Sequence, residues 1–178
     1  AEAGFRLTAE MFPEFGEAVF SLACLKLLRG DFRNGLPGYE YRFRKKEPVS
    51  ERDFPQPRWD LSAPSGRTVL LHAEQGFGDT VQAVRYASLL ARRGFRVLVE
   101  APPPLKRLLS GAHGVEIVVA RGEPLPDFDY HLPMMSLPLA FETTLETIPS
   151  EAPYIFPEPR LVETWRERMA GHEGFRAG

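Results

Sequence analysis

The chain has 178 residues, of which 43% are hydrophobic, so it can bury a core without metal ions or disulfides. Its net charge of −2 gives no reason to expect nucleic acid or an anionic membrane as a partner. The single cysteine, Cys24, excludes an internal disulfide and fits a reducing, cytoplasmic compartment. No apolar run reaches the roughly 18 residues of a membrane helix, so no membrane span is predicted.

Three segments follow from the composition along the chain: a helical hairpin at 1–44, a strap at 45–66 and an α/β domain at 67–178. The N-terminal stretch lacks the apolar core of a signal peptide. Both this stretch and the final "GHEGFRAG" are typical of positions inside a longer chain. We therefore expect the sequence to be a fragment.

The first segment predicts two short antiparallel helices. Apolar residues between Phe15 and Leu28 recur at three- and four-residue steps, which indicates a helix. Gly30 and Asp31 interrupt this pattern, and Asp31 is suited to cap a second helix that runs to about Phe43. The strap that follows is rich in proline and in charged residues, and its apolar residues show no helical or strand periodicity. Its tryptophan, Trp59, is expected to pin it to the domain that it crosses.

The hydrophobic pattern changes at Arg67, after which short apolar segments typical of strands alternate with segments of helical periodicity. Strands that are apolar on both faces are typical of a parallel sheet covered by helices on each side. The predicted fold class is therefore α/β, with a Rossmann-like parallel sheet flanked by helices. The predicted strands are 68–73, 96–101, 115–120 and 127–132, and the predicted helices are 80–93, 103–110 and 161–169.

A glycine-rich turn, "EQGFGD", follows the first strand. In open parallel sheets, ligands bind beyond the carboxyl ends of the strands. Gly76 and Gly78 allow close backbone approach, and the helix after them offers free N–H groups to a phosphate or a sugar. Alternatively, the glycines only form the turn. The dinucleotide fingerprint requires a third small residue where Val81 stands, so no cofactor is predicted.

Two carboxylates flank this turn, and each has two interpretations. Asp79 either caps the helix or acts as a general base that takes a proton from an incoming hydroxyl group. Glu74 either bonds the amides of the turn or orients an acceptor. The histidines are scattered and have no metal-ligand spacing, so no metal is predicted. There is no Gly-x-Ser-x-Gly motif, which argues against covalent hydrolysis.

Residues 59–94 resemble a module found after tetratricopeptide repeats in bacterial proteins. The resemblance rests on Trp59, a Gly-Arg pair, the motif Glu-Gln-Gly-x-Gly-Asp, Gln82 and an Arg-Tyr pair. The preceding residues 27–44 are similar to a last tetratricopeptide repeat, although Gly35, Pro37 and Arg42 depart from its pattern. Terminal repeats are often atypical in this way.

The module is similar to the amino-terminal half of a GT-B glycosyltransferase of family 9, the heptosyltransferase-like family. This resemblance implies two Rossmann-like domains, with the acceptor in the first and a nucleotide-sugar in a second that lies outside this chain. It also implies that the Asp of a Gly-Asp motif, here Asp79, is the catalytic base. The residues that we predict to bind the acceptor are Glu74, Gln75, Gly76, Gly78, Arg85 and His131.

The first functional hypothesis is therefore the acceptor-binding half of an inverting, metal-independent glycosyltransferase, inactive as a fragment. Its acceptor would be a hydroxyl group of a glycan, a lipid-linked sugar or a protein. A second hypothesis is a non-catalytic interaction module, in which the hairpin recruits a protein and the α/β domain is a degenerate scaffold. A third is nucleotide binding by the α/β domain alone.

Overall fold

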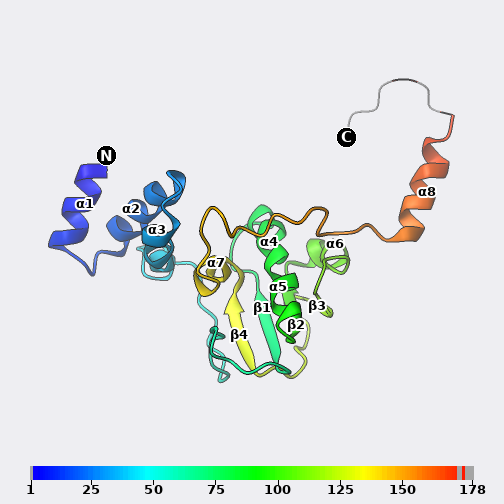
Figure 1. The fold of residues 1–178 in the computed structure, drawn as a ribbon, viewed down its shortest axis with the longest axis horizontal. Coiled ribbons are helices and arrows are strands. Elements are labelled where there is room, and N and C mark those ends of the chain that lie inside the picture. The colour runs from blue at the N-terminus through cyan, green and yellow to red at the C-terminus, as the bar shows by residue number, and fades with distance from the viewer. Residues whose placement is uncertain (1, 172–173, 175–178) are drawn as a thin grey trace.

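The computed structural model describes residues 2–171 and Gly174, so 172–173 and 175–178 of the predicted α/β domain lie outside the described residues. A helical N-terminal segment lies at one end of the molecule, the α/β unit is central, and helix α8 (Pro159–Met169) projects from the other end (Figure 1). None of the described helices is both long enough and apolar enough to cross a membrane.

The N-terminal segment contains the predicted hairpin and one additional helix. Asp31 begins the hairpin's second helix as predicted, because its carboxylate accepts the backbone N–H of Asn34 at 3.3 Å. The two hairpin helices approach closely at Gly35, where a Cβ would meet Cγ of Leu27 at 2.7 Å, which explains why no alanine stands there. The elements are α1 (Glu2–Met11), α2 (Gly16–Leu28), α3 (Phe32–Tyr39) and a 3-10 turn η1 (Glu40–Phe43).

The α/β unit has a four-stranded, all-parallel sheet in the order β3-β2-β1-β4, which confirms the predicted α/β, Rossmann-like class. The fourth strand begins three residues later than predicted. The side chain of Asp129 explains the late start, because it accepts the N–H of Thr68 at 2.8 Å in a side-chain bond that precedes the β1–β4 ladder. The strands are β1 (Thr68–His72), β2 (Arg96–Ala101), β3 (Ile117–Ala120) and β4 (Tyr130–Pro133).

Helices pack on one face of this sheet and bury alternate strand residues, such as Val69, Leu71, Val97 and Val99, in the main core.

The helix predicted at 80–93 is divided by a 3-10 turn. The helical elements are α4 (Phe77–Ala83), η2 (Val84–Tyr86), α5 (Ala87–Arg92), η3 (Pro103–Leu105), α6 (Lys106–Leu109), η4 (Met134–Ser136) and α7 (Leu137–Ala140).

The strap covers the second face, so the expectation of helices on both faces is wrong. Phe54 of the strap packs against the rings of His72 and His131, with centroid distances of 5.5 and 4.9 Å. Arg52 of the strap pairs with Glu100 of β2. The reason is that the connection between β3 and β4 contains no helix, and this face carries polar side chains that the strap can satisfy.

Trp59 fixes the strap to the α/β unit, as predicted. The side chain is 2% exposed and packs between Phe95 and Phe141, with ring centroids 5.8 and 5.2 Å away. Its backbone N–H also donates to the carbonyl of His131 at 2.8 Å. Aromatic packing and a backbone hydrogen bond therefore hold the strap against the α/β unit.

Candidate functional site

The glycine turn lies at the carboxyl edge of the sheet, between β1 and α4. Gly76 has φ −69° and Gly78 is not among the residues with positive φ, so neither glycine is required by the backbone conformation. Both are exposed, and a Cβ added to Gly78 would meet nothing within 4 Å. The open surface above Gly78 therefore leaves its backbone accessible to a ligand.

Asp79 stabilises this turn with one of its two oxygens. It is the third residue of α4, and its Oδ2 accepts the backbone N–H of Gly76 at 3.0 Å. Asp79 thus caps the helix from inside the first turn instead of preceding it. In the part of the chain that the structure describes, Oδ1 has no hydrogen-bond partner. This second oxygen is available to a ligand.

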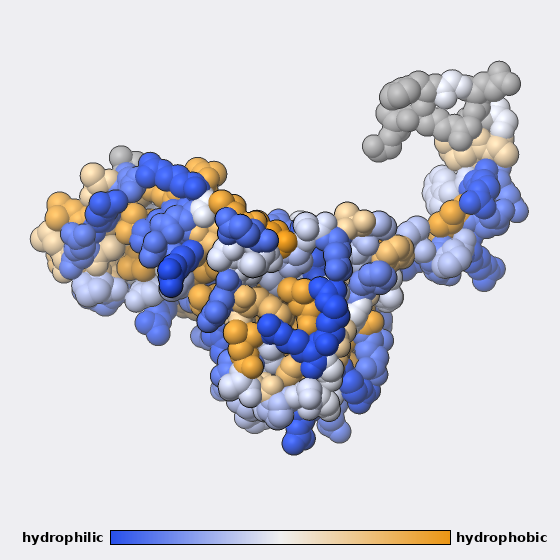
Figure 2. Space-filling view, in the orientation of Figure 1, coloured by the Kyte–Doolittle hydropathy of each residue, from blue (hydrophilic) through white to orange (hydrophobic). Residues whose placement is uncertain are grey.

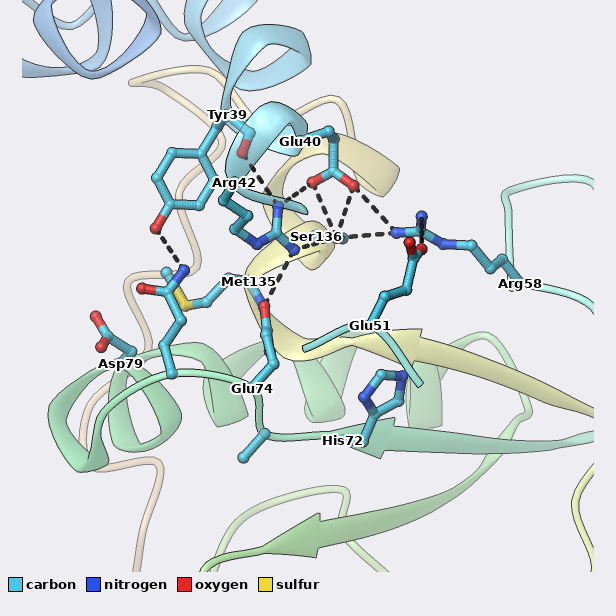
Figure 3. Close-up of polar contacts among 12 residues, drawn as sticks. Tyr39, Glu40, Arg42, Glu51, Arg58, His72, Glu74, Asp79, Met135 and Ser136 are labelled. Carbon is cyan, nitrogen blue, oxygen red and sulfur yellow. Dashed lines mark hydrogen bonds and ion pairs between the residues drawn. The ribbon is translucent and has the colours of Figure 1, made fainter. Parts of the chain in front are cut away.

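The hairpin supplies a hydroxyl group to the same corner. Nε2 of Gln75 donates to the hydroxyl oxygen of Tyr39, the last residue of α3, at 2.8 Å. Burial raises the pKa of Tyr39, and this effect outweighs the opposing hydrogen bond from Gln75 and the charge of Arg42. The tyrosine hydroxyl is therefore protonated at neutral pH, and its proton remains for another acceptor. Figure 3 shows Tyr39 and Asp79 on the same side of the turn.

Glu74 does not face an open site, because Arg42 of the hairpin covers it. The guanidinium of Arg42 is fully buried and donates to Oε1 of Glu74 at 3.0 Å. The same oxygen accepts the N–H of Met135 at 3.2 Å, and the Glu74 side chain is only 3% exposed. Burial raises the pKa of Glu74, although Arg42 opposes this rise. Glu74 therefore belongs to the interface between hairpin and sheet.

The buried interface extends to the strap through two further polar side chains (Figure 3). Arg42 also donates to Glu40 at 2.5 Å and to the hydroxyl of Ser136 at 2.6 Å. Ser136 in turn donates to Glu40, and Arg58 of the strap donates to both. One network of charged hydrogen bonds thus joins hairpin, strap and α/β unit. The departure of Arg42 from the repeat pattern was the one local signal, and it did not identify the partners Glu74 and Ser136, which lie 32 and 94 residues away along the chain.

The two remaining predicted residues lie away from the turn's open side. Arg85 holds the segment 149–154, since its guanidinium donates to the carbonyl of Pro149 and to the hydroxyl of Tyr154, each at 3.1 Å. His131 lies under the strap, where its Nδ1 is 3.2 Å from Nε2 of His72. The structure therefore brings together Gln75, Gly76, Gly78 and Asp79 as a site, with Tyr39 as the member that sequence reasoning missed.

The buried histidine pair is neutral. Burial, and after it the charges of His131 and the nearby arginines, lower the pKa of His72 to about 3. The pKa of His131 is also lowered, first by its burial and then by the charge of Arg58. Neither imidazole is placed to exchange protons with a ligand at the turn.

Among residues 2–171 and 174, no group of three or more His, Cys, Asp or Glu side chains is arranged to hold a metal ion. Comparisons with protein-family models, with curated proteins and with solved structures find no match.

Proposed function

We propose that this chain is the acceptor-binding half of a glycosyltransferase-like protein, which transfers a sugar from a nucleotide-sugar to a hydroxyl group. The observation that supports this function is the open glycine turn at the carboxyl edge of a parallel sheet, where the second oxygen of Asp79 has no partner among the described residues. The Gly-Asp motif on which the resemblance to the heptosyltransferase-like family partly rests, Gly78-Asp79, lies at this turn.

The polar groups at the turn complement a hydroxyl-bearing ligand. A hydroxyl group both donates and accepts hydrogen bonds. Oδ1 of Asp79 offers an acceptor, and the hydroxyl of Tyr39 keeps a proton to donate because its oxygen already accepts from Gln75. The acceptor would be a glycan, a lipid-linked sugar or a protein side chain.

In the transfer step, Asp79 would take the proton of the acceptor hydroxyl as the acceptor oxygen bonds to the anomeric carbon. The bond from that carbon to the nucleoside diphosphate breaks, the diphosphate leaves with the electron pair, and the sugar inverts its configuration. The donor would be held by a second domain, whose groups stabilise the leaving diphosphate.

Replacing Asp79 with asparagine tests this function, because asparagine keeps the size and the capping oxygen but removes the charge. We expect Asp79→Asn to bind saccharides about five- to tenfold more weakly, which corresponds to one charge-assisted hydrogen bond. Backbone amide shifts of Gly76 and Gly78 during NMR titration with neutral mono- and disaccharides measure the binding.

Asp31→Asn is the matched control, since Asp31 also caps a helix but lies in the hairpin turn between α2 and α3. It should leave saccharide binding unchanged. The proposal is wrong if no saccharide produces a saturable shift at the turn, or if Asp79→Asn binds as tightly as the native protein.

A second candidate function is protein interaction through the hairpin segment. A hollow of about 730 Å³ lies between α1 and α2, and apolar and hydrophilic patches alternate over this end of the molecule (Figure 2). Its exposed apolar residues include Leu7, Met11, Phe12 and Phe15. A partner that cross-links to α1 and is lost on Leu7→Asp, while saccharide binding persists, would favour this function.

A further inference from the structure

Two arginines lie at the carboxyl edge of the sheet on the face that the strap covers. Arg121 directly follows β3, and its backbone N–H donates to the carbonyl of Ala101 at 2.8 Å. Its guanidinium reaches across the end of β2 and donates to the carbonyl of Ala73, just after β1. This carbonyl holds one N–H group of the guanidinium, and the Arg121 residue is exposed.

The second arginine, Arg52, comes from the strap and is also held in place. Its guanidinium donates to Glu100 at 2.5 Å and lies over the ring of Phe54, 4.8 Å from the ring centre. Glu100 is buried, so its negative charge is matched by Arg52 and is shielded from solvent. The pair therefore adds no free negative charge to this edge.

Arg121 carries the uncompensated charge of the group. It is exposed, and within the described residues no carboxylate pairs with it. The neighbouring Arg58 is compensated by both Glu40 and Glu51. This edge therefore has a local excess of positive charge in a chain whose net charge is −2.

The contacts of the two arginines converge on neighbouring backbone positions. Arg121 donates to the carbonyl of Ala73, the N–H of Ala73 donates to the carbonyl of Glu100 at 2.9 Å, and the side chain of Glu100 pairs with Arg52. After burial and the neighbouring His131, the charges of Arg52, Arg58 and Arg121 all lower the pKa of His72, which falls to about 3. Because His72 stays neutral, it neither adds to nor neutralises the positive charge.

We infer that Arg121, together with Arg52, forms a binding site for an oxyanion, the phosphate or carboxylate group of a small molecule. The planar guanidinium fork binds such groups through two parallel hydrogen bonds. The carboxyl edge of a parallel sheet is where ligands of this fold class bind. This site goes beyond sugar transfer, because it uses neither Asp79 nor a donor domain.

Isothermal titration of the whole chain with inorganic phosphate at pH 7.5 and low salt tests the site. The native protein should give a saturable isotherm, and Arg121→Gln should bind phosphate at least tenfold more weakly. Arg33→Gln is the matched control, since Arg33 is an exposed arginine of α3 with no ion pair described, and it removes the same charge far from this edge. It should bind phosphate as the native protein does.

A second variant separates a geometric site from a diffuse positive field. Arg52→Lys keeps the charge and a partner for Glu100 but loses the fork, so it should also weaken phosphate binding. Absence of a saturable phosphate isotherm, or equal affinity in Arg121→Gln and Arg33→Gln, would overturn the proposal.

Three further ligands identify the group that is recognised. If glucose 6-phosphate competes with inorganic phosphate, the site recognises a phosphate group. If glucuronate competes with inorganic phosphate, the site recognises a carboxylate group. Glucose lacks an anionic group and reports only on the turn at Asp79, so the oxyanion site and the proposed function fail independently.

Discussion

Replacing Arg42 with alanine should lower the free energy of unfolding by about 3–5 kcal/mol, the range for breaking a buried ion pair on one side. Arg42 is fully buried, and its removal leaves the 3%-exposed carboxylate of Glu74 without its ion-pair partner. It also removes the link from the hairpin to Ser136 of the α/β unit. Urea denaturation followed by circular dichroism measures the change.

Arg44→Ala is the matched control, because Arg44 is exposed and lies two residues further along the chain. We expect it to change stability by no more than about 0.5 kcal/mol. The double variant Arg42→Met with Glu74→Leu should regain part of the loss, since it leaves no unpaired charge at this contact. A cost below about 1 kcal/mol for Arg42→Ala would mean that this network does not hold the hairpin to the sheet.

Acidification from pH 7 to pH 5 should lower the free energy of unfolding by about 2 kcal/mol through His72. The folded-state pKa of His72 is about 3, whereas the ordinary value is 6.5. Below pH 6.5 the unfolded chain binds a proton at this residue and the folded chain does not. Stability is therefore fully present above pH 6.5 and falls as the pH decreases toward 3. His131 acts in the same direction, because its pKa is also lowered.

His72→Leu tests the source of this pH dependence, because leucine fills the buried position without titrating. Denaturant unfolding at pH 7 and pH 5 should show a smaller difference for the variant than for the native protein. His113→Gln, which removes an exposed histidine, should leave the difference unchanged. An unchanged pH dependence in His72→Leu would show that another group causes it.

The buried network has a consequence for both candidate functions. Tyr39 and Arg42 belong to the hairpin, yet Tyr39 bonds Gln75 at the glycine turn and Arg42 bonds Glu74 just before it. The hairpin that would bind a protein and the turn that would bind an acceptor are therefore joined by direct side-chain hydrogen bonds. Coupling between the two binding events would follow if the partner displaced Tyr39.

Local patterns in the sequence determined the elements of this protein. The apolar runs determined the parallel strands, Asp31 determined the start of α3, and the two glycines with Asp79 marked the turn at the carboxyl edge. These signals succeed because a strand, a cap or a turn depends on residues within a few positions of one another.

Only the tertiary structure decided which of the candidate residues share a site. Glu74 is removed from the open site by Arg42, which lies 32 residues earlier, and the same guanidinium bonds Ser136, which lies 94 residues later. The strap, and not a second layer of helices, covers one face of the sheet through Phe54 and Arg52. Burial and pairing of charges depend on which distant segments pack together, and no local pattern carries that information.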